Sequence, residues 1–334
     1  MEKIPDSEMD QPLVSVLMIS YNHEKYIAQA IESIIRQQTG FRFELVIGED
    51  CSKDGTRRIC EQYAAAHPGL INLLPTPHNF GMMPNFCRTM HACRGKYIAV
   101  CEGDDYWTDP GKLQQQFDLL ENNPDANLCF HICREWSEAD QAFRETPAFP
   151  REQYGFRDFA SRGCFIHTCS ILFRNLPEIT GRFTDWTYTL SGGDYLLYLL
   201  CTQNNHRALV INKVMSVYRL HAGGSWTGLT NLRRTQLIDN DLLIYHQNLR
   251  LSGREKSLLN FQLKRIILGY LHYYFSIKGA AYGKLKRGVI FLFNRIYFIF
   301  GPGRLSSFLA LAVYPTIRKK ATTTIGEGIK KELA

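Results

Sequence analysis

The sequence lacks the features of a secreted or membrane-spanning protein. Residues 1–11 are polar and acidic and contain no apolar core of a signal peptide. The most apolar stretch, residues 289–315, is interrupted by Arg295 and by the break at residues 301–304. Neither half reaches the roughly 20 apolar residues of a spanning helix. No cysteines form a C-x-x-C pair, and the ten cysteines are scattered as small buried residues usually are. We therefore expect a protein of the reducing cytoplasm.

Three common motifs of nucleotide and ester chemistry are also missing. The chain has no G-x-G-x-x-G dinucleotide loop, no G-x-x-x-x-G-K-[ST] phosphate loop and no G-x-S-x-G nucleophile turn. These absences disfavour dinucleotide dehydrogenases, P-loop kinases and α/β-hydrolases. The composition, with 45% hydrophobic and 21% charged residues, is that of a chain with a substantial core.

The charge of the chain is divided unevenly. The net charge is +7, but residues 250–334 contain 16 lysines and arginines against three acids, which gives +13, whereas residues 1–249 carry −6. The basic part is rich in Phe, Leu, Ile and Tyr, which is typical of an interfacial element and not of a nucleic-acid binder. We predict that residues 250–334 bind an anionic membrane surface at the cytoplasmic face. The alternative is that they pack on the catalytic domain or form a homodimer.

Strand and helix patterns alternate in the first third of the chain. Strands are predicted at residues 13–19, 43–48, 70–74 and 96–101, and helices at 26–37, 54–66, 84–93 and beyond the Asp109-Pro110 cap. This alternation predicts βαβ units and an α/β fold with a mostly parallel sheet. Strands and loops predominate from 127 to 217, with a helix at 194–203. The expected divisions are a tail (1–12), a main domain (13–228) and a helical C-terminal region (229–334).

Polar and acidic residues follow three of these strands. The segments are residues 20–24 (SYNHE), 49–56 (EDCSKDGT) and 102–109 (EGDDYWTD). Ligands of an open parallel sheet bind beyond the carboxyl ends of its strands. We therefore expect the three segments to form one site.

The adjacent acids Asp104 and Asp105 are the most distinctive feature of these segments. Neighbouring carboxylates raise each other's pKa unless a cation lies close to them. Mg²⁺ and Mn²⁺ prefer oxygen ligands, commonly one or two carboxylates together with substrate phosphates. The alternative is a solvated acidic turn in which Asp109 caps the next helix. The position after a buried strand favours a divalent metal site.

Four segments, in this order, resemble family 2 glycosyltransferases of the GT-A fold. They are residues 14–22 (VSVLMISYN), 49–56, 79–85 (NFGMMPN) and 103–110 (GDDYWTDP). The resemblance covers residues 13–225. It implies a GT-A fold in which residues 13–110 bind a nucleotide-sugar and residues 111–228 bind the acceptor.

The resemblance also implies roles for individual residues. Tyr21 stacks near the nucleotide base, Asp50 contacts the base, Asp104 faces the ribose or sugar, and Asp105 is the expected direct ligand of Mn²⁺ or Mg²⁺. Additional donor-binding residues are Ser20, Asn22, Glu24, Ser52 and Arg219. In the segment from Tyr218 to Ser225, which resembles the part that closes over the pyrophosphate, His221 is expected to bind metal or phosphate.

The expected general base is Asp194, which follows Ser191, Gly192 and Gly193 at the start of a predicted helix, as in the family. The alternative is a helix N-cap, which is compatible with catalysis because backbone N–H groups can orient a carboxylate there. The expected acceptor contacts are His167, Trp107 and Trp186, for each of which a structural role in the core is the alternative.

The sequence thus predicts an inverting, metal-dependent glycosyltransferase with a UDP-sugar as donor and a carbohydrate or lipid-linked acceptor, of the kind that acts in surface polysaccharide or glycan biosynthesis. The processive-synthase signature Q-x-x-R-W is absent, so a single addition is expected. The alternatives are a nucleotidyltransferase, and a non-catalytic, nucleotide-binding scaffold associated with the membrane.

Overall fold

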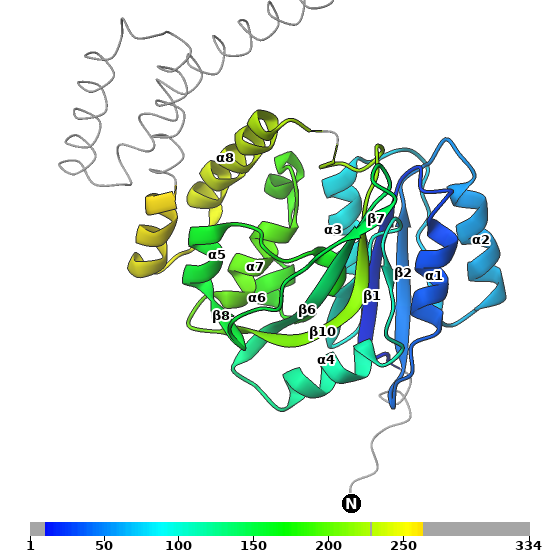
Figure 1. Ribbon diagram of the computed structural model, residues 1–334, viewed down its shortest axis with the longest axis horizontal. Helices are drawn as coiled ribbons and strands as arrows, with labels where there is room; N and C mark the ends of the chain where they lie inside the picture. Colours follow the sequence, from blue (N-terminus) through cyan, green and yellow to red (C-terminus); the bar gives the residue numbers. More distant parts are fainter. Residues whose placement is uncertain (1–10, 228, 263–334) are drawn as a thin grey trace, which may run out of the picture. The chain divides into compact units, whose positions relative to one another are not determined.

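The computed structural model describes residues 11–227 and 229–262. The chain divides into two compact units, Met1–Leu237 and Ile238–Ala334. A mixed sheet of ten strands forms the centre of the first unit (Figure 1). Residues 263–334, which include most of the region predicted to bind membrane or to dimerise, lie outside the described part. Within that part, no helix is long and apolar enough to span a bilayer.

The sheet is mostly parallel, as the sequence predicts. Across its main path the strands are β3 (Ile71–Leu73), β2 (Phe43–Glu49), β1 (Val14–Ser20), β4 (Tyr97–Val100), β9 (Leu172–Arg174), β6 (Ala126–Ser137), β10 (Arg207–Leu220) and β5 (Tyr106–Trp107). The first four are parallel, and so are β6 and β10. Antiparallel β9 joins these two groups, and β5 pairs antiparallel with β10. Two further antiparallel strands, β7 (Ala142–Arg144) and β8 (Gln153–Gly155), pair with β6 and β10.

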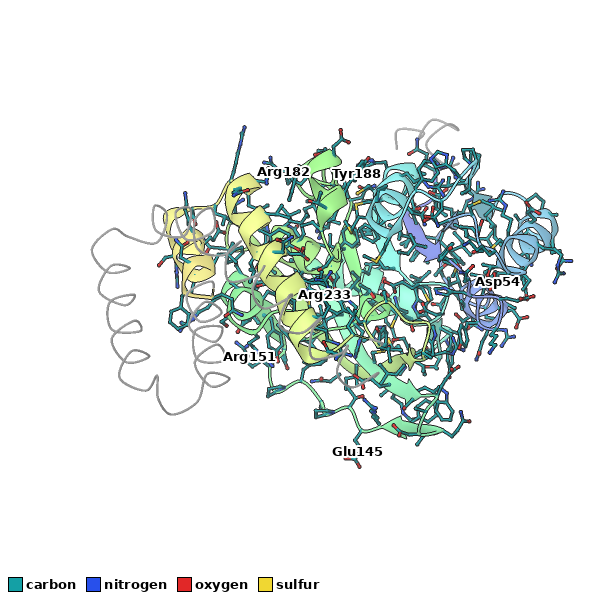
Figure 2. All side chains as sticks on the ribbon, turned by 90° about the horizontal axis from the view of Figure 1, so that it is seen from above. Asp54, Glu145, Arg151, Arg182, Tyr188 and Arg233 are labelled. Atoms are coloured by element: carbon teal, nitrogen blue, oxygen red, sulfur yellow. The ribbon has the colours of Figure 1, made fainter. Side chains whose placement is uncertain are left out.

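Helices lie along both faces of this sheet (Figure 1). They are α1 (Ile27–Ile35), α2 (Thr56–Ala66), α3 (Met82–Ala92), α4 (Lys112–Glu121), α5 (Phe156–Arg162), α6 (Pro177–Thr180) and α7 (Asp194–Thr202), with short 3-10 helices η1 (Thr168–Ser170) and η2 (Asp185–Thr189). A further helix, α8 (Asn231–Asn248), begins in the first unit and continues into the second. Figure 2 shows Tyr188 of η2 beside α3, in agreement with the contacts between these elements.

The apolar side chains on both sides of β1 explain why helices cover both faces of the sheet. Val14, Val16 and Met18 belong to one buried cluster with apolar residues of α1 and α4. The intervening Leu17 is equally buried but does not belong to that cluster, and α3 packs on β1 and β2. A strand that is apolar on both sides requires helices on both sides, since successive side chains point to opposite faces.

A buried carboxylate fixes the end of the sheet where the parallel strands begin. Glu44 of β2 accepts a hydrogen bond from Ser15 Oγ of β1 at 2.6 Å and from the backbone N–H of Arg94 at 2.9 Å. The Arg94 guanidinium donates to the other oxygen from Nε at 3.0 Å and from Nη2 at 2.6 Å. Ser15 Oγ in turn accepts the N–H of Gly95. The charge of Glu44 is therefore fully paired, which is the condition under which a buried carboxylate is tolerated.

A buried lysine lies in the core between α4 and the sheet. The Lys112 ammonium donates to Gln116 Oε1 at 2.7 Å and lies 3.9 Å from the centre of the Trp107 ring. No carboxylate pairs with it among the described residues, and the nearby ionisable groups that act on it are the thiols of Cys101, Cys129, Cys169 and Cys133. Burial lowers the pKa of Lys112 from 10.5 to about 8.

This shift predicts a dependence of stability on pH. Between pH 8 and pH 10.5 the unfolded chain keeps a proton on Lys112 that the folded chain has released, so stability should rise with pH in this window. Lys112→Met removes the titrating group. The stability of the wild type relative to this variant should therefore rise by up to about 3 kcal/mol across the window, measured by urea unfolding. Parallel pH profiles for the two proteins would contradict this, and exposed Lys25→Met should follow the wild type.

Candidate active site

Backbone hydrogen bonds join the carboxyl ends of three strands. Beyond β4, the N–H of Gly103 donates to the carbonyl oxygen of Ile19 in β1 at 3.0 Å. Beyond β2, the N–H of Asp50 donates to the carbonyl oxygen of Ser20 at 2.9 Å. The three polar segments of the sequence therefore leave the sheet side by side, as expected.

Gly103 allows the close approach of β1 to the chain beyond β4. A Cβ at this position would lie 2.7 Å from Ser20 Oγ and 2.9 Å from Ile27 Cδ1. Ser20 Oγ is buried and finds no hydrogen-bond partner among the described residues. Because this hydroxyl lies at the end of β1 with free hydrogen-bonding capacity, it is available to a ligand that reaches the strand ends.

Hydrogen bonds join the first two polar segments, residues 20–24 and 49–56. The side chains that form these bonds are among those expected in the donor site. The N–H of Asn22 donates to Ser52 Oγ at 2.8 Å, and Asn22 Oδ1 accepts the N–H of Lys53 at 2.8 Å. Asn22 has a φ of 57°, which asparagine tolerates better than most residues. Glu24 lies against Gly55 and is exposed. Tyr21 is 39% exposed, so part of its ring is open to a ligand.

Asp50 is held by the segment that precedes α3. Its two carboxylate oxygens accept the N–H groups of Phe80 at 2.8 Å and Gly81 at 2.9 Å. Asn79 donates from its side chain to the Asp50 carbonyl oxygen. A carboxylate oxygen has two lone pairs, so these contacts leave Asp50 able to accept further hydrogen bonds.

Arg88 of α3 is a residue of this region that the sequence reading missed. Its guanidinium lies 4.6 Å from the centre of the Phe80 ring and donates to the carbonyl oxygens of Glu49 and Pro75 at 3.2 and 3.0 Å. It therefore fixes the loop that binds Asp50. The sequence feature that could have identified Arg88 is its position one helical turn after Asn85. The side-chain oxygen of Asn85 accepts a hydrogen bond from Arg88 Nε.

The two adjacent acids lie in different environments. Asp104 Oδ2 is 3.0 Å from His221 Nε2 and 3.6 Å from His23 Nε2, and its side chain is 19% exposed. Burial raises the pKa of Asp104, but the hydrogen bond from His221 and the charge of His23 outweigh it, so the net shift is downward. His23 was not among the expected site residues, although it lies in the first polar segment.

Asp105 points into the structure. It is 1% exposed, and its Oδ1 accepts the backbone N–H of Arg219 in β10 at 2.9 Å. Its Oδ2 is buried without a hydrogen-bond partner among the described residues. Burial, together with the nearby Cys169, Asp104 and Glu102, raises the pKa of Asp105 well above its ordinary value. Asp104, and not Asp105, is therefore the member of the pair that lies beside His221.

Arg219 stabilises the backbone around Asp104. Its guanidinium donates to the Asp104 carbonyl oxygen and to Gln29 Oε1, and lies 5.1 Å from the Tyr26 ring centre and 4.5 Å from that of Tyr106. Because it is buried and already bonded, its visible role is to hold the backbone of Asp104.

Asp194 begins helix α7, as the sequence predicts. Its Oδ1 accepts the N–H of Tyr195 at 2.8 Å. Burial raises the pKa of Asp194, and the hydrogen bond from Tyr195 opposes the shift. A Cβ on Gly193 would lie 2.9 Å from the Phe86 ring, so glycine permits α7 to begin against α3.

Glu102 is a further acid beyond β4. Burial is the main reason that its pKa is raised to about 7, and the negative charges of Asp104 and Asp194 add to the shift. A carboxyl group with such a pKa can gain or lose a proton near neutral pH.

The expected acceptor residues lie in three different environments. His167 Nε2 lies 3.2 Å from Glu135 Oε1, and its ring stacks on Tyr218 at 4.5 Å between centres. Trp107 is 4% exposed and donates from Nε1 to the Cys169 carbonyl oxygen, while Lys112 covers its ring. Trp107 is therefore a core residue with no ring face open to a sugar. Trp186 is half-buried on η2.

The residues present provide a limited donor set for a metal. In the described part of the chain, no group of three or more His, Cys, Asp or Glu side chains is arranged as a complete metal site. Asp104 and His221 supply one carboxylate and one imidazole. This set fits Mg²⁺ or Mn²⁺, which commonly take one or two protein carboxylates and complete their coordination with phosphate oxygens and water.

Comparison with known proteins identifies the type of domain. Residues 15–178 match the model of glycosyl transferase family 2. An uncharacterized protein of Mycobacterium tuberculosis is 35% identical over 221 residues, which is 66% of this chain and 62% of that protein. The chain thus spans less than two thirds of this relative. A dTDP-rhamnosyl transferase, RfbG of Shigella flexneri, is 33% identical over 110 residues, 32% of this chain and 37% of its own length.

Solved structures show that the fold is GT-A. The S. aureus protein TarS in complex with UDP-GlcNAc has a TM-score of 0.54 and 17% identity, over 78% of this chain and 73% of TarS. A mannosyltransferase of Pyrobaculum calidifontis, in complex with GDP-Man and Mn²⁺, has a TM-score of 0.55 and 17% identity, over 93% of this chain and 84% of the other. The expected GT-A fold is confirmed.

The close approach at Gly103 leads to a prediction. Gly103→Ala places a methyl group against Ser20 and Ile27, so it should lower the free energy of unfolding by about 1–3 kcal/mol. Gly40→Ala is the matched control, because its Cβ would meet Gln114 Oε1 at an ordinary 3.6 Å. Urea unfolding of both variants provides the measurement. Equal stability of the two would show that the strand ends separate at little cost.

Proposed function

Because residues 15–178 match the model of glycosyl transferase family 2, we propose that the chain transfers a sugar from a nucleotide-diphosphate donor to an acceptor hydroxyl, with inversion at the anomeric carbon. The observation that carries the proposal is that the three polar segments leave the sheet side by side, with the Asp104 carboxylate 3.0 Å from His221 Nε2. Ligands of an open parallel sheet bind at the carboxyl ends of its strands, which supports a donor site there.

The donor site in this proposal lies over the ends of β1 and β2. The partly open ring of Tyr21 stacks on the nucleotide base, and Asp50 accepts a hydrogen bond from it. The free hydroxyl of Ser20 and the loop held by Asn22 and Ser52 complete this side. UDP-sugars are the first donors to test; TarS is described with UDP-GlcNAc and the mannosyltransferase with GDP-Man.

Asp104 and His221 are the groups that would hold a divalent ion, Mn²⁺ or Mg²⁺. When bound, the ion would neutralise negative charge on the departing diphosphate. In this arrangement Asp105 supports the site indirectly, because its carboxylate fixes the N–H of Arg219 and hence the end of β10 two residues before His221. In this proposal the partly exposed carboxylate of Asp104 contacts the ligand, and the buried carboxylate of Asp105 contacts the protein.

Asp194 is the general base of the proposed reaction. Its carboxylate takes the proton of the acceptor hydroxyl while that oxygen attacks the anomeric carbon, and the nucleoside diphosphate leaves from the opposite face. A raised pKa improves a carboxylate as a base, since the ideal catalytic pKa lies near the working pH. A carbohydrate or lipid-linked acceptor in glycan biosynthesis is the proposed substrate class.

The general-base assignment predicts a large loss of activity in Asp194→Asn. Turnover should fall by at least about 100-fold, because the amide cannot accept the proton, while the dissociation constant for UDP should change less than about threefold. Asp118→Asn, on the exposed side of α4, should leave both quantities unchanged. Steady-state assays and calorimetry measure the two effects, and normal turnover in Asp194→Asn would remove Asp194 from the mechanism.

The metal assignment makes a separate prediction for the two acids. Asp104→Asn and His221→Ala should each weaken UDP binding by at least about tenfold in the presence of Mn²⁺ and have little effect without metal. Asp105→Asn should mainly lower thermal stability. Calorimetry with and without Mn²⁺ distinguishes these outcomes, and loss of the Mn²⁺ effect in Asp105→Asn alone would assign the ligand to Asp105.

The overall test is a thermal-shift panel of nucleotide-sugars with Mn²⁺, followed by product analysis with the donor that stabilises the protein most. Transfer with inverted configuration supports the proposal. Donor binding without transfer or hydrolysis would favour the alternative of a non-catalytic scaffold.

A further inference from the structure

Tyr26 directly precedes helix α1 and joins two distant parts of the candidate site. Its hydroxyl donates a hydrogen bond to Glu138 Oε1 at 2.8 Å, across 112 residues of sequence. Glu138 follows the last residue of β6, and its own N–H donates to the carbonyl oxygen of Leu220 at 3.0 Å. Leu220 is the last residue of β10 and precedes His221. Tyr26 is therefore connected, through Glu138, to the backbone beside His221.

The ring of Tyr26 also packs directly on the imidazole of His221. The two ring centres lie 4.7 Å apart, with 49° between the ring planes. The side chain of His221 is 4% exposed. On the Tyr26 ring there are two further contacts, since the His23 ring centre lies at 6.4 Å and the Arg219 guanidinium at 5.1 Å. Because the interior is closely packed here, the Tyr26 ring restricts rotation of the imidazole toward α1.

The orientation of His221 matters because of its partner in the proposed metal site. His221 Nε2 lies 3.0 Å from Asp104 Oδ2. Two neighbouring ligands of an octahedral ion, each about 2.1 Å from it, are roughly 3 Å apart. The imidazole and the carboxylate thus already have the spacing of such a pair, and rotation of the imidazole would destroy it. A group that prevents this rotation keeps the pair preorganised for an ion.

We propose that Tyr26 is a positioning residue for His221: its ring packs on the imidazole, and its hydrogen bond to Glu138 fixes the ring. The inference rests on the proposed function of His221 as a residue that holds Mn²⁺ or Mg²⁺. The hydroxyl of Tyr26 is used in the hydrogen bond to Glu138, so Tyr26 acts on the ion through His221 and not as a ligand. Burial and this hydrogen bond raise the pKa of Tyr26 to about 12, so the hydroxyl remains a donor at neutral pH.

The first test measures the Mn²⁺ effect, which is the ratio of the dissociation constants without and with Mn²⁺. Calorimetry provides it with UDP or GDP, whichever binds the wild type more tightly. Tyr26→Phe and Glu138→Ala lose the hydrogen bond and should each reduce the ratio by about threefold. Tyr26→Leu also loses the ring and should reduce it by about fivefold or more. Glu138→Gln keeps an acceptor and should retain the wild-type ratio.

The controls separate positioning from a general loss of structure. Nucleotide binding without metal should be unchanged in every variant, because Tyr26 acts on the ion alone. Tyr63→Phe is the matched control: Tyr63 donates its hydroxyl to Glu32 at 2.7 Å, and neither residue belongs to the candidate site. This variant should keep the full Mn²⁺ effect. A wild-type Mn²⁺ effect in Tyr26→Leu, or an equal loss of binding with and without metal, overturns the proposal.

The second test observes the imidazole itself, in protein without metal or nucleotide. The Cε1–H resonance of His221 is assigned by NMR from its absence in His221→Ala. In Tyr26→Phe and Glu138→Ala this resonance should broaden or split, because the imidazole takes more than one orientation. Glu138→Gln and Tyr63→Phe should give the wild-type line. The same single line in Tyr26→Phe, Tyr26→Leu and the wild type overturns the proposal.

The two failures are distinguishable. No Mn²⁺ effect in the wild type, or a full one in His221→Ala, would show that the proposed metal role of His221 is wrong, and the NMR test then decides alone whether Tyr26 positions the imidazole. A Mn²⁺ effect that is lost in His221→Ala and kept in Tyr26→Leu would leave His221 in the site and remove Tyr26 from it.

Discussion

The candidate site depends on two backbone hydrogen bonds that continue the sheet beyond its strands, from Gly103 to Ile19 and from Asp50 to Ser20. They set the ends of β1, β2 and β4 at the same level, so that the loops after them start from neighbouring points. The contacts of the site follow from this: Asn22 reaches Ser52 and Asp104 reaches His23 because these loops leave side by side. The glycine at 103 is required because no side chain fits where the chains approach.

The adjacent acids show how local context divides residues of one kind between two functions. Asp104 lies at the surface of the site beside two imidazoles, and Asp105 turns inward to accept the N–H of Arg219. Two neighbouring ionised carboxylates repel, and this division places the first beside two imidazoles, where its pKa is lowered, and leaves the second with a raised pKa. The resemblance to a family cannot show which of the two is exposed, because that depends on the register of β10 against β5.

Patterns that are local in the sequence were predictable, and contacts between distant segments were not. The strands and helices of the first third follow from apolar periodicity, and Asp194 at a helix start follows from the preceding glycines. The structural role of Trp107 could not be predicted from the sequence, because its burial depends on Lys112 and on the Cys169 carbonyl oxygen, 62 residues further on. Likewise, Arg88 acts through hydrogen bonds to the carbonyl oxygens of Glu49 and Pro75, which belong to an earlier segment of the chain. The short strand β9, which joins the two parallel groups, has too few residues to show a period.

The loop that contains His167 has a consequence for how such a protein could change. His167 pairs with Glu135 of β6 and stacks on Tyr218 of β10, so one loop residue joins two neighbouring strands. Loop exchange is the usual route to a new ligand in proteins whose loops are independent of the scaffold. Here a transplanted loop would have to supply its own partner for Glu135 and its own ring for Tyr218. A change in this loop would therefore act on β10, the strand that ends one residue before His221.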